Sequence, residues 1–155
     1  MIKGVKICGI SNPETLRYIL NHNNPPKFIG FICNYKKSRR YVPYENLQKL
    51  ISVEKKNVYF VSVLVNPDDN ILEKIKDMCF DYYQLYDVNP DRTKYIKDKY
   101  GKKIISALTI SNEADINNYK HYQKISNILL FDGKGYEKSV SFNHDLLGAI
   151  PKKLN

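Results

Sequence analysis

The sequence contains no long hydrophobic segment. No apolar run in its 155 residues approaches the roughly 18 residues that a membrane-spanning helix needs. The N-terminus also lacks the order of basic, apolar and small residues that is typical of a signal peptide. From these two absences we expect a protein that acts in water and has no membrane partner.

Cysteine is scarce, and the motifs that depend on cysteine or histidine are absent. The three cysteines, Cys8, Cys33 and Cys79, are odd in number and form no CxxC pair. We therefore expect a reducing, cytoplasmic location and no disulfide framework. The sequence has no P-loop, no GxGxxG motif, no clustered metal ligands and no serine–histidine pair with a supporting acid. It predicts neither a metal nor a bound cofactor.

Acidic residues are outnumbered by basic ones. Lys and Arg total 25 against 16 Asp and Glu, a formal net charge of +9, which could serve nucleic acid, a membrane surface or an anionic small molecule. The basic residues are spread along a chain also rich in asparagine, isoleucine and tyrosine, and their one tight cluster is at 36–40. No helix-turn-helix, zinc-finger or RNP motif accompanies them. The pattern favours a solvated basic surface and predicts no nucleic-acid partner.

Predicted strands and helices alternate along the chain. With 155 residues and 43% hydrophobic content, we expect one domain over 1–155 with its own core. Six alternations without an intervening hairpin predict an α/β fold with an all-parallel sheet. The expected strands are 5–8, 28–32, 58–65, 82–85, 104–108 and 128–131, and the expected helices 13–21, 43–51, 69–78, 90–100 and 113–122, followed by a short amphipathic stretch at 142–150. Both an open doubly wound sheet and a (β/α) barrel fit this pattern.

Polar residues collect where the predicted strands end. In either architecture the active site lies at the carboxyl ends of parallel strands. The residues there are Cys8-Gly9, the basic loop 36–40, Asn66, Gln84, Ala107 and Asp132-Gly133. A thiol, a guanidinium and a carboxylate would thus converge on one face, which could supply a general base, an anion anchor and a general acid.

Five segments spread over the chain resemble one known family. They are Val5-Lys6-Ile7-Cys8-Gly9-Ile10, 28–31 followed by Lys37-Ser38-Arg39-Arg40-Tyr41-Val42, 61–66, Gln84-Leu85 and Leu129-Leu130-Phe131-Asp132. In this order they resemble phosphoribosylanthranilate isomerase, a family of ketose-forming isomerases in tryptophan biosynthesis. The resemblance implies a TIM-type (β/α) barrel, of which this chain holds six of eight units. It also implies a cofactor-free Amadori rearrangement of N-(5-phosphoribosyl)anthranilate to its 1-deoxyribulose 5-phosphate isomer.

The resemblance also implies roles for individual residues. Asp132 would be the general acid that opens the furanose ring, and Cys8 the general base that removes the C2′ proton. Arg40 would hold the anthranilate carboxylate through a charge-assisted pair. The remaining residues expected to contact the anionic, phosphorylated substrate are Lys6, Gly9, Gln84 and Gly133.

Three features depart from the family pattern. Tyr86 stands where the family usually has histidine, and bulky or charged residues replace glycines in the loop 133–139. The sequence stops after the sixth unit, so we expect the two last units, with their phosphate-binding loops, to lie outside it. Open barrel edges would favour a homo-oligomer or a partner chain that covers them. Two other interpretations stay open, a catalytically impaired barrel remnant that binds a partner and an open-sheet regulatory domain.

Overall fold

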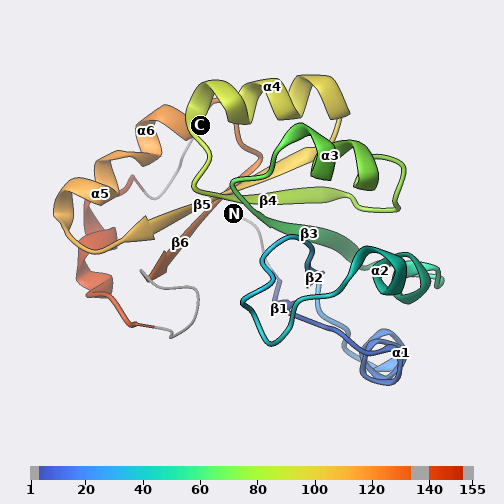
Figure 1. The fold of residues 1–155 in the computed structure, drawn as a ribbon. Coiled ribbons are helices and arrows are strands. Elements are labelled where there is room, and N and C mark those ends of the chain that lie inside the picture. The colour runs from blue at the N-terminus through green and yellow to red at the C-terminus, as the bar shows by residue number, and fades with distance from the viewer. Residues whose placement is uncertain (1–3, 134–139, 152–155) are drawn as a thin grey trace.

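Six parallel strands form one sheet in the computed structural model, which describes residues 4–133 and 140–151 (Figure 1). The strands are β1 (Lys6–Cys8), β2 (Phe28–Ile32), β3 (Tyr59–Val65), β4 (Tyr82–Tyr86), β5 (Lys103–Ile110) and β6 (Ile128–Gly133). Each strand begins and ends within two residues of its predicted bounds. The predicted all-parallel α/β fold is confirmed.

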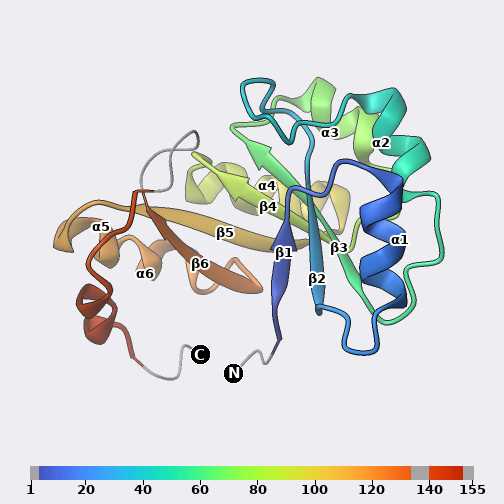
Figure 2. The ribbon, with the colours of Figure 1, turned by 90° about the horizontal axis from the view of Figure 1, so that it is seen from below.

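The order of the strands distinguishes a barrel from a doubly wound sheet. Every strand pairs with its neighbour in sequence, from β1 to β6 without a reversal. A doubly wound sheet has a switch point where the strand order reverses, and here there is none. The sheet instead curls, with its helices on the outer side, as the two views show (Figures 1 and 2). This is the (β/α)-barrel arrangement with six units, and it excludes the open-sheet interpretation.

Four of the α-helices begin at side-chain caps. Asn12, Asp68, Asn89 and Asn112 each accept a hydrogen bond from a backbone N–H of the first turn, which satisfies donors that a helix leaves unpaired. The helices are α1 (Pro13–Asn21), α2 (Tyr44–Ile51), α3 (Asp69–Ile75), α4 (Pro90–Tyr100), α5 (Glu113–Asn117), α6 (Tyr119–Tyr122) and the 3₁₀ helix η1 (His144–Ala149). The four with these caps are α1, α3, α4 and α5. Across the described ranges, no helix is both long and apolar enough to cross a membrane.

Two predicted helices differ from the structure by more than one residue. The helix predicted for 69–78 ends at Ile75. The helix predicted for 113–122 is two short helices, because the N–H of Asn118 bonds to the carbonyl of Asp115, three residues back, and interrupts the α pattern. The final amphipathic stretch, for which the sequence predicted no helix type, contains η1.

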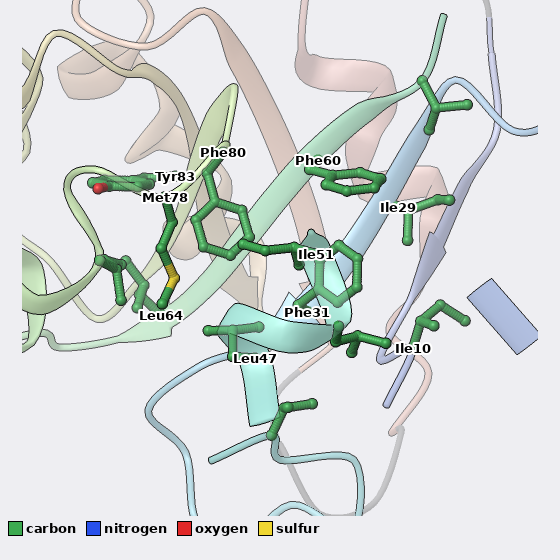
Figure 3. Close-up of a cluster of buried hydrophobic side chains, with 14 of the residues drawn as sticks. Ile10, Ile29, Phe31, Leu47, Ile51, Phe60, Leu64, Met78, Phe80 and Tyr83 are labelled. Carbon is green, nitrogen blue, oxygen red and sulfur yellow. The ribbon is translucent and has the colours of Figure 1, made fainter. Parts of the chain in front are cut away.

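Two apolar layers lie on opposite faces of the sheet. The outer one joins the sheet to α1–α4, and Figure 3 shows Phe31, Phe60 and Phe80 at its centre. Phe31 and Phe60 meet edge to face, with ring centroids 5.1 Å apart. The inner layer fills the concave side with Phe28, Tyr82 and neighbouring aliphatic residues. Because both faces are covered, the strands are nearly continuous apolar runs.

The first and last strands are the edges of the described sheet. Within the described ranges β1 pairs with β2 alone and β6 with β5 alone. Val5 and Ile7 at the β1 edge are 66% and 37% exposed, and the apolar residues of β6 are only half-buried. Each edge therefore presents apolar surface together with backbone groups that can pair with a further strand.

Candidate active site at the carboxyl ends of the strands

Lys6 and Cys8 lie over the same glycine on the inner face of the sheet. Residue 8 of β1 is opposite Gly30 of β2 in the strand register. A Cβ on Gly30 would come within 2.8 Å of the Lys6 Nζ and 2.9 Å of the Cys8 Sγ. Both side chains thus occupy the space that any larger residue at position 30 would need. Lys6 and Cys8, both predicted site residues, therefore lie side by side on this face.

Gly9 makes room for Arg40. The backbone at Gly9 has φ +83, in the left-handed region, and its N–H donates to the Gly30 carbonyl at 2.8 Å. A Cβ at position 9 would approach the Arg40 Cδ to 2.5 Å. The Arg40 Nη1 donates to the Cys8 carbonyl at 3.1 Å. The guanidinium is therefore held beside the end of β1 while most of its donors remain directed elsewhere.

The basic loop after β2 is anchored by contacts that the sequence analysis did not find. The Asn34 amide donates to the Val65 carbonyl and accepts from the Val65 N–H, both at 2.8 Å. These two hydrogen bonds have the pattern of those between paired strands, and they hold the loop at the end of β3. The same loop then returns to β2, because Tyr41 forms a bridge with Ile32. The signal in the sequence is an asparagine two residues after the end of β2, a residue type that often bonds to nearby backbone.

Asp132 and Gly133 belong to β6 rather than to the loop after it. The prediction ended this strand at residue 131, but β5 continues to Ile110 and pairs Thr109 with Asp132 and Ile110 with Gly133. A Cβ on Gly133 would lie 1.8 Å from the Val140 carbonyl oxygen, so the returning backbone needs a glycine there. This contact gives Gly133 a packing role. The rest of the altered loop, 134–139, is outside the described residues.

The Asp132 carboxylate is bonded to Tyr86 across the inner face. The Tyr86 hydroxyl donates to the Asp132 Oδ2 at 2.8 Å, and the Gln84 Nε2 donates to the same hydroxyl oxygen at 3.1 Å. Burial raises the pKa of the Tyr86 phenol well above its usual value, and the neighbouring charges of Asp132 and then Cys8 raise it further. The phenol is thus a permanent donor near neutral pH, close enough to both Asp132 and Cys8 to interact with their charges.

The other two cysteines are poorly placed to transfer protons at the strand ends. The Cys33 thiol donates to the Phe31 carbonyl at 3.2 Å, and burial raises its pKa to about 12. Cys79 is exposed and donates to the Ile51 carbonyl at 3.3 Å on the outer layer. Cys33 stays protonated near neutral pH and Cys79 lies on the helical side. Cys8 is therefore the cysteine whose position suits proton transfer at the strand ends.

The predicted site residues form two groups on one face. Lys6, Cys8, Gly9 and Arg40 gather around the ends of β1 and β2, and Gln84 and Asp132 meet through Tyr86 at β4 and β6. Within 4–133 and 140–151, no group of three or more His, Cys, Asp or Glu side chains is arranged to hold a metal ion. A surface hollow between α2 and α3, lined in part by Gln48 and Asp77, contains none of these residues. The two groups are linked by Tyr86, which bonds to Asp132 and lies close enough to Cys8 to interact with its charge.

Comparison with known proteins identifies the family to which this chain is similar. The family model of N-(5'phosphoribosyl)anthranilate (PRA) isomerase matches residues 5–154. The N-(5'-phosphoribosyl)anthranilate isomerase of Zymomonas mobilis subsp. pomaceae is 35% identical over 131 residues, which are 83% of this chain and 61% of that protein.

Two solved structures share the fold. Monomers generated from the dimeric phosphoribosylanthranilate isomerase of Thermotoga maritima match with a TM-score of 0.75 and 25% identity, over 92% of this chain and 66% of that one. A phosphoribosyl anthranilate isomerase in complex with reduced 1-(o-carboxyphenylamino)-1-deoxyribulose 5-phosphate matches with a TM-score of 0.71 and 26% identity, over 83% and 63% of the two chains. The present chain therefore spans less than two thirds of the length of each protein compared.

Proposed function

The chain belongs to the N-(5'-phosphoribosyl)anthranilate isomerase family, and we propose that it performs the family reaction in tryptophan biosynthesis. The substrate is N-(5-phosphoribosyl)anthranilate, and the product is its 1-deoxyribulose 5-phosphate isomer. The observation that carries this proposal is that Cys8 with Arg40, and Asp132 with Tyr86, lie at the strand ends of one (β/α) barrel, with Tyr86 close enough to interact with the charges of both Asp132 and Cys8. A related protein with a bound 1-deoxyribulose 5-phosphate derivative adds support.

Asp132 is the general acid of the proposed reaction. Its protonated carboxyl donates a proton to the furanose ring oxygen, and the C1′–oxygen bond breaks as the anilino nitrogen forms an iminium. The carboxylate that remains accepts a hydrogen bond from Tyr86. Donors aimed at a charge that develops during a reaction lower its barrier. A positioned acid of this kind contributes roughly 10²–10⁴-fold to the rate.

Cys8 is the general base of the second step. The thiolate removes the proton from C2′ of the iminium and forms an enolamine, which tautomerises to the ketone product. Only protons move and only the ring C–O bond breaks, so the reaction needs no redox cofactor. A thiol that works as a base must remain reduced, and we therefore propose that the protein acts in the cytoplasm.

The remaining site residues hold the substrate. Arg40 binds the anthranilate carboxylate, since a guanidinium matches the geometry of a carboxylate and one of its nitrogens is already fixed on the Cys8 carbonyl. Lys6 provides a second cation beside the thiol. Gln84 contributes an amide oxygen that, within the described residues, accepts no hydrogen bond. Gly9 and Gly133 leave room for groups that pack against the backbone, the Arg40 side chain at Gly9 and the Val140 carbonyl at Gly133.

We propose one barrel domain over 1–155 whose two open edges are covered in the working protein. The described β1 and β6 both expose apolar surface, and an unpaired strand favours association with another chain. A related isomerase is dimeric by description. We therefore expect a second copy of this chain to cover the edges.

Two variants of the purified chain test the catalytic roles. Cys8→Ala and Asp132→Asn should each reduce kcat by roughly 10²-fold or more, because each removes a proton-transfer group, while circular dichroism stays unchanged. Cys79→Ala and Asp98→Asn are the matched controls, since both side chains are exposed on the outer layer. Turnover of synthetic N-(5-phosphoribosyl)anthranilate is the measurement.

The same assay decides between the enzyme and the barrel remnant. A wild-type chain that turns over and loses activity in both site variants supports the isomerase. A folded wild type without turnover contradicts the proposal and favours a remnant that binds a partner. Site variants with wild-type rates would leave the family intact but contradict the assignment of Cys8 and Asp132.

A further inference from the structure

A chain of three side chains crosses the inner face from β4 to β6. Gln84 donates to Tyr86, and Tyr86 donates to Asp132. Gln84 is 1% exposed and Tyr86 is 9% exposed, so water has little access to the first two members. Positions 84 and 86 lie on the same face of β4 because side chains alternate along a strand.

The intervening strand leaves room for this contact. β5 lies between β4 and β6, and its register sets Ala107 opposite Tyr86 on one side and Leu130 on the other. The buried alanine is a small residue beside the phenol. A larger side chain at 107 would compete with the ring for the path to Asp132. The hydrogen bond between Tyr86 and Asp132 joins residues that are 46 positions apart in sequence.

We propose that Tyr86 is a positioning residue for Asp132, an inference that rests on the proposed isomerase function. Its hydroxyl occupies Oδ2, which leaves Oδ1 to carry the proton that is given to the ring oxygen of the substrate. Tyr86 keeps its own proton throughout. What changes in the step is the charge on the carboxyl group that it faces.

The hydroxyl becomes a stronger partner as the reaction proceeds. Before proton transfer it faces a neutral carboxylic acid, and afterwards it faces a carboxylate. Hydrogen bonds to a charged acceptor are roughly twice as strong as neutral ones. The difference favours the transition state over the bound substrate, so it acts on kcat more than on KM. The bond from Gln84 polarises the hydroxyl in the same direction.

Tyr86→Phe removes the hydroxyl and keeps the ring. A hydrogen bond to a charged group exceeds one to a neutral group by about 1–1.5 kcal/mol, so kcat should fall about 5-fold to 13-fold while KM changes by no more than about twofold. Tyr82→Phe is the matched control, because it makes the same change on the same face of β4 near the opposite end of the sheet. An unchanged kcat in Tyr86→Phe would overturn the proposal.

A spectroscopic experiment tests the contact without turnover. The chain is labelled with ¹³Cζ-tyrosine, and the Tyr86 signal is the one that Tyr86→Phe removes. We expect that signal to move in Asp132→Asn, and the Tyr82 signal to stay in place. A Tyr86 signal that ignores Asp132→Asn overturns the proposal even in an active enzyme. If the wild type is inactive but its Tyr86 signal responds to Asp132→Asn, the contact between Tyr86 and Asp132 is supported and the proposed isomerase function is overturned. The catalytic role of the contact is then overturned as well.

Discussion

At the scale of single residues, the glycine after β1 combines two constraints. Its φ of +83 lies where residues with a Cβ are strained, and the Arg40 side chain fills the space in which a Cβ would stand. Gly101 at the end of α4 has a similar φ of +62, but no heavy atom lies within 4 Å of its would-be Cβ. Alanine at either position should strain the backbone, but only alanine at position 9 should also displace the Arg40 side chain.

Gly9→Ala should therefore weaken substrate binding as well as the fold. Strain of about 1–2 kcal/mol is common to Gly9→Ala and Gly101→Ala, so both variants should have a lower Tm. Only Gly9→Ala moves the guanidinium, and it should raise KM about 10-fold or more. Steady-state kinetics and thermal melts of both variants provide the measurement. Equal KM values in the two variants would contradict the proposal that Gly9 leaves the space that the Arg40 side chain needs.

At the scale of elements, α3 and α4 are joined by a network of charges. Asp69 pairs with Arg92, and Glu73 pairs with Lys76 and Lys99. Hydrogen bonds from Lys76, Lys99 and the Tyr100 hydroxyl lower the pKa of the Glu73 carboxyl to about 2. Each pair is exposed and weak alone, but together the pairs fix two neighbouring helices of the outer layer.

This network should make stability depend on pH in the acid range. The pKa of Glu73 is lower in the folded chain than the value of 4.5 expected without its partners, so its contribution is complete above about pH 4.5 and is lost as pH falls toward 2. Glu73→Gln should lower Tm at pH 6, and the difference from the wild type should shrink toward pH 2. Glu45→Gln, in the first turn of α2, is the control. A difference that stays constant with pH would contradict the role of the network.

At the scale of the whole molecule, the described sheet has two open edges, at β1 and β6. Apolar Val5 and Ile7 stand exposed at the β1 edge, next to backbone groups that can pair with another strand. A closed barrel has no such edge. The proposed covering of these edges by a second copy can therefore be tested in solution.

Sedimentation should detect this association. We expect the wild-type chain to form dimers or larger species as its concentration rises, because association buries the edges. Val5→Lys adds a charge at the β1 edge and should shift the equilibrium toward monomer. Tyr18→Lys, on α1 and 71% exposed, makes a similar change away from the edge and should have little effect. A wild type that sediments as a monomer at every concentration would contradict the proposed covering of the edges by a second copy.

Local chemistry in the sequence determined the elements and the candidate residues. The bounds of α1, β2 and α4 follow from neighbouring residues alone, such as Asn12 before Pro13 and Gly101 after Tyr100, because caps and apolar periodicity act over a few positions. The strand ends likewise pointed to Cys8 and Asp132 from the sequence.

The tertiary structure alone decided which of these residues meet. Periodicity alone left the barrel and the open sheet undecided; the family resemblance favoured the barrel, and the strand order confirmed it. The extension of β6 to Asp132 depended on its pairing with β5. The bond from Tyr86 to Asp132 depended on both. These are contacts between residues far apart in the chain, formed when apolar faces are buried together. Their energies arise from neighbours that no short stretch of sequence contains.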